Sequence, residues 1–580
     1  MKKPVIILFF LYGISDTHAQ SMYPNDVEDR IRQVEQTIGL VKFQIDGKPN
    51  VTIEERMAQY GIKGISVAVI HNYKIEWAKG YGWADSSERR LVTSETLFEP
   101  GSISKSLNAL GALKLVEEKK IDLDEDINIY LKSWKFPYDK ATDGKKITVA
   151  HLLSHTAGLN VHGFPGYFRG DIFPTLPQIL DGKPPANTEA VRSLFVPGLR
   201  FEYSGGGTTI SQLIQMDITG KLYDHHILQE VFEPLGMSRS SFTQPPPENK
   251  RNMLATGYSQ NGKEIKGKYP ILIEQAAGGL WTTPTDLCKF IIEMQLSLEG
   301  KSNKVLSRKM TKKMLTPYKN KVAGFGCFIE NRNGTKYFQH GAQNLGFSGQ
   351  YFGSFKDGNG IAVVVNSDAG QSMISEIINS VARVYHWKGF IPEEEIITKK
   401  KIQVDNLVLE KYIGAYKQDN MIITISKGEE DLLYQAGERP WKMYFDSDTT
   451  FFNLESGSEK VFYKDTNGVI GGFSRRVKNK DLGKMEKIAL MVLPDDLMNT
   501  YAGTYMDGKD PVIISKKENY LLVDRGYGTP LVPLYFISDT DFFMSVDFGA
   551  QYKFILDASG NVEEVYRTMG KEHTSVKRVK

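Results

Sequence analysis

The chain has 580 residues, more than one hydrophobic core usually organises, and this length predicts roughly two to four domains. Hydrophobic residues make up 41% of the chain and charged residues 24%, as in soluble globular proteins, which excludes a disordered chain, a collagen-like chain and a membrane bundle. The net charge of +3 is far from the basic excess of a nucleic-acid-binding protein, so no nucleic acid partner is expected.

The first residues of the chain predict a secretory leader. Two lysines precede an apolar stretch from Pro4 to Tyr12 that is too short to span a bilayer, and small residues stand before the expected cut after Ala19. We expect a signal peptide over residues 1–19 and a periplasmic or secreted mature protein without a membrane span. A retained anchor helix is the alternative.

Residues 20–390 show a mixed pattern that predicts one α+β domain. Hairpin-like strands stand at 64–82, and glycine-bounded strands at 349–367 precede a helix at 373–385. This order predicts an antiparallel sheet flanked by helices. The two cysteines, Cys288 and Cys327, are too few for a disulfide framework, but a bridge between them stays open.

The stretch EPGSISKSL at 99–107 places a lysine at the start of an apolar helix. Residues three apart are neighbours on a helix, so Ser102 and Lys105 can meet while the other two serines point elsewhere. A lysine held there loses hydration, which disfavours its charged form and lets the amine accept a proton from the hydroxyl. A lysine whose stem packs and whose head reaches water is the alternative.

The C-terminal third contains a weak internal repeat, which predicts a duplicated domain. YIGAY at 412–416 matches YAGTY at 501–505, and DTTFF at 448–452 matches DTDFF at 539–543. Each copy alternates short β-branched and aromatic runs with turn residues, so we expect two small antiparallel, lipocalin-like barrels over 405–490 and 495–580. Residues 391–404, which change from acidic to basic, predict an exposed linker.

Six segments resemble one known family. SISK, LLSHTAGL at 152–159, PGLRFEYSGGG at 197–207, PLGMSRSSF at 234–242, GGLWTTPTDL at 278–287 and QHGAQNLGFSG at 339–349 resemble the class C β-lactamase and penicillin-binding-protein family of serine hydrolases in order and spacing. The resemblance covers about residues 45–390. It implies an α/β sheet domain joined to a helical subdomain, with the reactive site between them.

The resemblance also implies roles for individual residues. It makes Ser102 the nucleophile and Lys105 the neighbouring base, and Tyr203 shares proton transfer with Lys105. His340 and Gly341 match the third motif, which orients the substrate. The oxyanion formed by attack on a carbonyl is expected to accept hydrogen bonds from the N–H groups of Ser102 and Gln343.

Two positions depart from the family pattern. Gly205 stands where many members have an asparagine that binds the substrate side-chain amide, and Ala342 adds a methyl group where the third motif usually ends in glycine. Both leave the nucleophile and bases in place but bear on the substrate. The histidine pairs His151–His155 and His225–His226 lack the context of a zinc site, so we expect no metal ligands among them.

The resulting prediction is a secreted serine hydrolase that forms an acyl-enzyme with a small amide or ester: a D-amino-acid peptide, a β-lactam or a carboxylic ester. It needs no cofactor, and its partner is a small-molecule or peptide substrate. One catalytic domain followed by two barrels also resembles the D-aminopeptidase branch of the family. The alternative is a penicillin-binding-like receptor or cell-envelope scaffold that acylates slowly or never turns over. The oligomeric state stays open.

Overall fold

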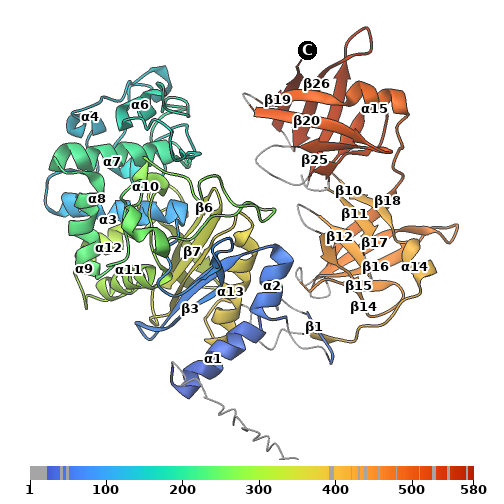
Figure 1. Cartoon of the computed structure of the whole chain (residues 1–580), viewed down its shortest axis with the longest axis horizontal. Helices are drawn as coiled ribbons and strands as arrows, with labels where there is room; N and C mark the ends of the chain where they lie inside the picture. Colours follow the sequence, from blue (N-terminus) through green and yellow to red (C-terminus); the bar gives the residue numbers. More distant parts are fainter. Residues whose placement is uncertain are drawn as a thin grey trace, which may run out of the picture.

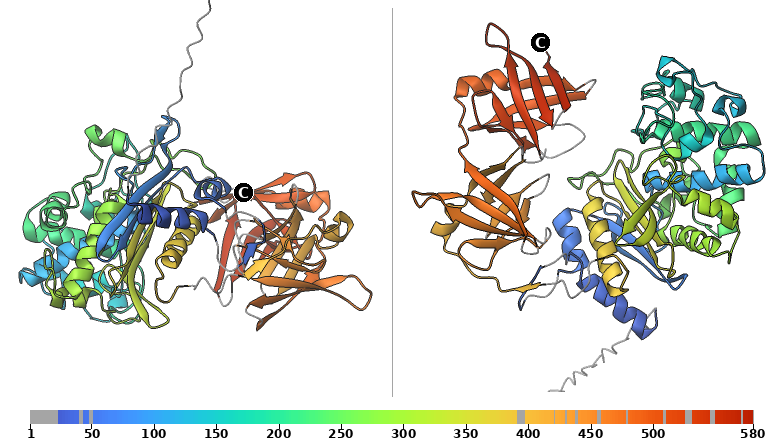
Figure 2. Two further views of the ribbon diagram at one scale, coloured as in Figure 1. Left: turned by 90° about the horizontal axis from the view of Figure 1, so that it is seen from below. Right: turned by 180° about the vertical axis from the view of Figure 1, so that it is seen from behind.

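The computed structural model describes residues 23–39, 43–47, 51–390, 397–419, 421–428, 431–436, 440–454, 458–477, 480–507, 510–524, 531–544, 549–569 and 572–579. The expected leader at 1–19 lies outside this set. Within it, no helix is both long and apolar enough to cross a bilayer. A mixed α+β body is followed by two β-barrels that lie to one side of it (Figures 1 and 2).

A seven-stranded antiparallel sheet forms the centre of the α+β body, in the order β4-β3-β2-β8-β7-β6-β5. Its strands are β2 (Gly64–His71), β3 (Lys74–Asp85), β4 (Arg90–Leu91), β5 (Phe328–Arg332), β6 (Thr335–Asn344), β7 (Phe347–Ser354) and β8 (Gly360–Val365). The hairpin expected at 64–82 is β2 and β3, and the strands expected at 349–367 are β7 and β8.

The sheet is apolar on both faces because helices cover both. Side chains alternate along a strand, so Ile65 and Val67 of β2 join a core shared with α1 (Asn25–Gln36), α2 (Ile53–Tyr60) and α13 (Gly370–Val384). Ala68 and Ile70 join the larger core on the other face, with α3 (Ser104–Glu117) and α11 (Pro284–Leu298).

The remaining helices are mostly short, and many belong to a helical part beside the sheet (Figure 1). They are α4 (Ile127–Tyr130), α5 (Val149–Leu153), α6 (Leu176–Asp181), α7 (Gly205–Thr219), α8 (Tyr223–Ile227), α9 (Glu233–Leu235), α10 (Gln275–Gly278) and α12 (Arg308–Met314). Four further turns of tighter or wider helix are η1 (Gly101–Ile103), η2 (Lys140–Thr142), η3 (Leu228–Phe232) and η4 (Glu248–Met253).

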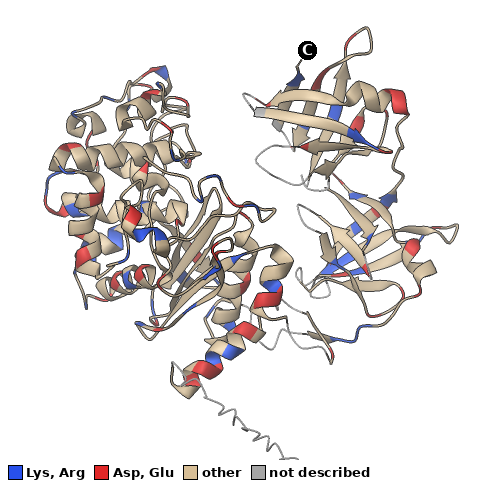
Figure 3. Ribbon diagram, in the orientation of Figure 1, with Lys and Arg blue, Asp and Glu red and all other residues tan. Residues whose placement is uncertain are grey.

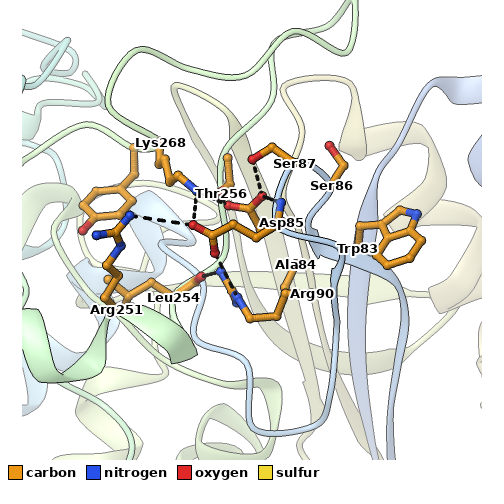
Figure 4. A network of polar contacts seen from close by, with 12 residues as sticks. Trp83, Ala84, Asp85, Ser86, Ser87, Arg90, Arg251, Leu254, Thr256 and Lys268 are labelled. Carbon is orange, nitrogen blue, oxygen red and sulfur yellow. Dashed lines mark hydrogen bonds and ion pairs between the residues drawn. The ribbon is translucent and has the colours of Figure 1, made fainter.

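A partly buried polar network fixes the end of β3 (Figure 4). The fully buried carboxylate of Asp85 accepts hydrogen bonds from Lys268 at 2.5 Å and from the Thr256 hydroxyl at 2.6 Å. Burial alone would raise the pKa of Asp85, but these hydrogen bonds hold it well below its usual range. Lys268 also pairs with Glu88 at 2.6 Å, so the network ties the β3–β4 hairpin to the segment that leads to α10.

Each barrel is a nine-stranded antiparallel sheet whose end strands are nearly adjacent in the chain. The first has α14 (Asn406–Glu410), β10 (Gly414–Gln418), β11 (Met421–Lys427), β12 (Leu432–Gln435), β13 (Pro440–Lys442), β14 (Tyr444–Phe445), β15 (Thr450–Phe452), β16 (Glu459–Lys464), β17 (Ile470–Val477) and β18 (Lys480–Ile488). The second has α15 (Asp495–Tyr501), β19 (Gly503–Asp507), β20 (Asp510–Lys517), β21 (Tyr520–Asp524), β22 (Val532–Pro533), β23 (Tyr535–Phe536), β24 (Asp541–Phe543), β25 (Ala550–Leu556), β26 (Val562–Met569) and β27 (Glu572–Arg578). The predicted fold class, an α+β domain with two antiparallel barrels, is confirmed.

Matching residues of the sequence repeat make matching contacts in the two barrels. Tyr412 stacks on Phe462 with ring centroids 3.8 Å apart, and Tyr501 stacks on Phe554 at 4.1 Å. The Tyr412 hydroxyl donates to the carbonyl of Asp448, as the Tyr501 hydroxyl does to Asp539. The aromatic residues of the repeat therefore form the same core twice.

The segment expected as an exposed linker is partly built into the fold. Residues 391–396 lie outside the described residues, but β9 (Ile397–Lys399) pairs in parallel with β1 (Phe43–Ile45), and Val404 is buried in the core of the first barrel. The Phe43 ring also packs edge-on against Phe452 of that barrel. The sequence did not predict this pairing, because the segment is charged and its partner strand lies about 350 residues earlier in the chain.

Charged residues of both signs are interspersed over the chain, as along α1 (Figure 3). The two cysteines are free thiols, both buried. Cys288 lies on α11, and Cys327 precedes β5. Burial raises the pKa of Cys327 to about 12, so this thiol stays protonated.

Candidate active site

A cavity of about 1060 Å³ opens between the end of the sheet and the helical part. Seven of the eight predicted site residues line it: Ser102, Lys105, Tyr203, His340, Gly341, Ala342 and Gln343. They come from three separate parts of the chain: the contiguous η1 and α3, the segment before α7, and β6. The fold therefore brings together the residues that the sequence singled out.

Lys105 lies beside Ser102, as the spacing predicts. The Lys105 side chain is 3% exposed, and its Nζ atom donates to Ser102 Oγ at 3.1 Å and to the carbonyl oxygen of Ala277, in α10, at 2.7 Å. The amine is thus held by two fixed acceptors inside the protein. The alternative of a lysine whose head reaches water does not fit this burial.

The turn before Ser102 needs a glycine. Gly101 has a left-handed backbone (φ 66°), and a Cβ atom there would stand 2.7 Å from Asn344 Oδ1. Ser102 then lies in the short η1 turn, where its N–H has no partner from a preceding helical turn. Ser104 is tied to the backbone of Gly101, and Ser106 to that of Gly326, so both serve structure.

Tyr203 is clamped by aromatic rings. Its ring centroid lies 4.2 Å from that of His155 and 4.8 Å from that of His162, and Lys105 Nζ is 5.0 Å from the same centroid. His155 Nδ1 accepts the N–H of Ser204, the residue that caps α7. Burial, with help from nearby Lys105, lowers the pKa of His155 well below its usual value. A neutral imidazole therefore fixes the backbone and ring of Tyr203.

His340 is also buried and neutral. Burial first, and then the nearby Lys105, lower the pKa of His340 to about 3. Its Nδ1 lies 2.6 Å from the carbonyl oxygen of Gly341, which can only accept, so Nδ1 carries the proton. Nε2 is then a buried acceptor without a hydrogen-bond partner among the described residues. In this third motif the neutral His340 therefore supplies the Nε2 lone pair, whereas a lysine at the same position would supply a positive charge.

The C-terminal half of β6 has an open edge. β5 pairs with β6 from Thr335 to Gln339, so His340–Asn344 extend past the last β5 partner, Phe328. The Gly341 carbonyl lies on this open edge, since it accepts from a side chain. Backbone groups alternate between the two edges of a strand, so the N–H of Gln343 shares that edge with Gly341. Gln343, whose N–H is the predicted oxyanion donor, and Ser102 both line the cavity.

Comparison with known proteins decides the family. The beta-lactamase family matches residues 50–380, more than half of the chain. The chain belongs to the beta-lactamase family. The predicted family and the predicted enzyme class, a serine hydrolase, are confirmed at this level.

Two curated relatives and one solved structure illustrate the similarity. A protein named "Putative penicillin-binding protein PbpX" from Bacillus subtilis (strain 168) is 25% identical over 340 residues, 57% of this chain and 77% of that protein. The teichoic acid D-alanine hydrolase of Staphylococcus aureus is 26% identical over 343 residues, 56% of this chain and 77% of that protein. The octameric penicillin-binding protein homologue from Pyrococcus abyssi aligns with a TM-score of 0.49 and 20% identity over 82% of this chain and 97% of its own.

Of the two residues that depart from the beta-lactamase family pattern, Gly205 does not line the cavity. Gly205 is buried under the preceding loop: its N–H donates to the carbonyl of His162, and a Cβ atom would meet that oxygen at 3.0 Å and the Phe164 ring at 3.2 Å. A larger residue at this position would move the loop, so Gly205 acts by shaping the wall and not by contact with substrate. Ala342 does line the cavity, though it is only 7% exposed.

The loop over residues 162–171 is the main part of the site that sequence reasoning missed. It supplies Phe164 and Phe168 as apolar wall and Asp171 as a carboxylate. Its closing contact is a pair of backbone hydrogen bonds between Tyr167 and Ile271, at 2.8 and 2.7 Å. The loop has neither periodicity nor a catalytic motif, so only the contact with a distant segment assigns it to the site.

Charge in the cavity is unevenly distributed. Asp171 and Asp368 are the acidic residues of its wall, and Lys105 is its lysine. No arginine of the described chain lines it. With His340 neutral, the wall offers two carboxylates against one amine that is already engaged with Ser102. Such a cavity favours a cationic group over an anionic one.

Proposed function

We propose that this serine hydrolase forms an acyl-enzyme at Ser102 and acts on esters or amides of D-amino acids whose amino group is free. The observation that carries the reaction is the buried amine of Lys105, 3.1 Å from Ser102 Oγ, in the wall of a cavity. The observation that favours this substrate class is the excess of carboxylate on that wall.

The chemistry follows from the contacts. Lys105 takes the Ser102 proton while Oγ attacks the carbonyl carbon. The bond to the leaving alcohol or amine then breaks, and the proton passes to that leaving group with Tyr203 as the relay. A water molecule attacks the acyl-enzyme and gives up its proton by the same route. The products are the free amino acid and the restored Ser102 hydroxyl.

The oxyanion is stabilised by two backbone donors. The N–H of Ser102 lies at the start of η1, and the N–H of Gln343 lies on the open edge of β6. Each such donor contributes about 2.7–4 kcal/mol to barrier reduction. The Nε2 lone pair of His340 offers an acceptor on the same wall, suited to a substrate N–H or to the Tyr203 hydroxyl.

The free amino group is the part of the substrate that the wall charges favour. Asp368 is half-buried and uses one oxygen to accept the N–H of Gly346 at 2.5 Å, and Asp171 is exposed at the mouth. A penicillin brings a carboxylate, and the described residues of this wall offer it no arginine. The D configuration is supported by one relative, which is named a teichoic acid D-alanine hydrolase.

The test compares p-nitrophenyl esters of D-alanine, L-alanine and N-acetyl-D-alanine. We expect kcat/KM for the free D-alanyl ester to exceed that for its N-acetyl form at least tenfold, and Asp368→Asn to reduce this ratio. Equal hydrolysis of the acetylated ester, or faster turnover of a penicillin, would contradict the substrate class. Intact mass reports the non-catalytic alternative, because a lasting acyl adduct without released product would identify a binder.

Export is part of the same proposal. A leader over residues 1–19, cut after Ala19, would deliver the enzyme to the periplasm or the medium, where cell-envelope D-amino-acid esters and peptides occur. Cell fractionation followed by N-terminal sequencing tests this point. A mature protein that starts at Gln20 is expected, and an intact Met1 in the cytoplasmic fraction would refute export.

A further inference from the structure

Glu99 is a buried carboxyl three residues before the nucleophile. Its side chain is fully buried, and Oε1 accepts a hydrogen bond from Gln244 Nε2 at 2.8 Å. The same Nε2 donates to the carbonyl of Gly279, just after α10, at 2.9 Å. Glu99 is therefore linked to the helix whose Ala277 carbonyl accepts from Lys105.

The Asn344 side chain is the second amide beside the Glu99 carboxyl, and it lowers the pKa of that carboxyl. Its Nδ2 donates to the carbonyl of Gly278 at 3.1 Å. Its Oδ1 lies so close to Gly101 that a Cβ atom added to this glycine would be only 2.7 Å from it. Asn344 also directly follows Gln343 on β6. One amide thus contacts the turn before Ser102, the end of α10 and the strand that carries the oxyanion donor.

The network lacks a donor unless the carboxyl holds a proton. Glu99 Oε2 and Gln244 Oε1 are both buried acceptors without a hydrogen-bond partner in the described part of the chain. As a carboxylic acid, Glu99 supplies an O–H that can donate to Gln244 Oε1. As a carboxylate, it leaves both of these buried acceptors unpaired.

The surroundings agree with the acid form. Burial raises the pKa of Glu99 to about 8, and the amides of Gln244 and Asn344 offset only part of this effect. These two amides are the groups that face the carboxyl, and no charged side chain of the described residues contributes to the shift.

We propose that Glu99 is a positioning residue for acylation: as a carboxylic acid it pairs with the Gln244 amide and packs against Asn344. The two amides then hold the end of α10 and set the spacing between Ser102, the Gln343 N–H and the carbonyl that orients Lys105. The proposal rests on the acyl-enzyme chemistry proposed above, but not on the choice of substrate. Glu99 touches no reacting atom, so its loss should lower the acylation rate more than it raises KM.

The experiment uses the whole chain, with p-nitrophenyl acetate for the acylation rate and a fluorophosphonate probe for labelling of Ser102. Neither reagent depends on a D-amino acid, so failure of the substrate class and failure of this proposal give different results. Three variants are compared: Glu99→Gln, which keeps one acceptor and a donor; Glu99→Met, which keeps neither; and Glu95→Gln, an exposed control four residues earlier. The melting temperature is recorded for each.

Glu99→Gln is expected to acylate within about threefold of the wild type at pH 7, while Glu99→Met loses about 10- to 100-fold in kcat with a small change in KM. Wild-type acylation should decline as the pH rises through about 8, and Glu99→Gln should lack this decline. Glu95→Gln should match the wild type throughout. An identical alkaline decline in Glu99→Gln, or wild-type acylation by Glu99→Met, would overturn the proposal. If Glu99→Met does not fold, the pH profile of Glu99→Gln decides alone.

Discussion

The amine of Lys105 lies 3.1 Å from the hydroxyl of Ser102, one helical turn away, and 2.7 Å from the carbonyl of Ala277. The carbonyl fixes the direction of the amine, so the position of Nζ that faces Ser102 Oγ is held in place for proton exchange with the hydroxyl. This arrangement combines a local spacing in the sequence with a distant contact that only the fold supplies.

Lys105→Met should remove the base and keep the packing, because methionine fills the same buried channel without a charge. We expect the rate of Ser102 acylation to fall about 10²–10⁴-fold, the usual contribution of general base catalysis. Stopped-flow measurement with p-nitrophenyl acetate gives this rate. Lys114→Met, on the half-buried side of the same helix, is the matched control and should leave the rate unchanged.

Tyr203→Phe should separate the hydroxyl from the ring. The ring contact with His155 at 4.2 Å would be kept, so the fold and substrate binding should change little. We expect acyl-enzyme to accumulate and kcat to fall about 10²-fold, because the relay to the leaving group and to water is lost. A burst in product release followed by a slow steady state reports this. Turnover equal to that of the wild type would remove Tyr203 from the mechanism, and Tyr520→Phe serves as an exposed control.

His340→Gln should change how stability depends on pH. The pKa of His340 is lowered to about 3 in the folded protein, against about 6.5 in an unfolded chain. Between these values the unfolded chain binds the proton and the folded one does not, so the wild type loses stability as the pH falls. Relative to His340→Gln, the free energy of unfolding should fall by up to about 1.4 kcal/mol per pH unit below pH 6. Urea titrations at several pH values measure it, with the exposed His225→Gln as control.

Glu274→Gln should have the opposite dependence. Glu274 precedes α10, is fully buried, and has neither carboxyl oxygen hydrogen-bonded within the described chain. Burial raises its pKa to about 7, so the folded protein keeps a proton that the unfolded chain releases from about pH 4.5 upward. The wild type should therefore lose stability relative to Glu274→Gln as the pH rises from 4.5 to 7, with no further divergence above that. Parallel stability curves for the two proteins would contradict this.

The sequence was most informative where function depends on local spacing. Ser102 and Lys105 are one turn apart, and the Tyr203 and His340 segments carry recognisable flanking residues, so their arrangement could be predicted. Glu99 lies in the same motif, but its partners Gln244 and Asn344 are more than 140 residues away. Nothing in its neighbourhood distinguishes it from an exposed glutamate, because burial is set by tertiary packing.

The same limit explains the other differences. The aromatic repeat predicted two barrels because short alternating strands are a local pattern, and the matching Tyr412 and Tyr501 contacts bear this out. The pairing of β1 with β9 left no such pattern, since a three-residue strand has too little periodicity to identify. The place of Gly205 in a motif predicted that it bears on the substrate. The structure shows instead that the 162–171 loop lies over it and separates it from the cavity.

The parallel pairing of Phe43–Ile45 with Ile397–Lys399 gives the molecule a second tie between its hydrolase body and its first barrel. The chain crosses from one to the other after Phe390, but a strand from well before the sheet also reaches across and packs Phe43 on Phe452. A protease nick between these bodies would therefore not free the barrels. The cut would still leave β1 of the hydrolase fragment paired with β9 of the barrel fragment and Phe43 packed on Phe452.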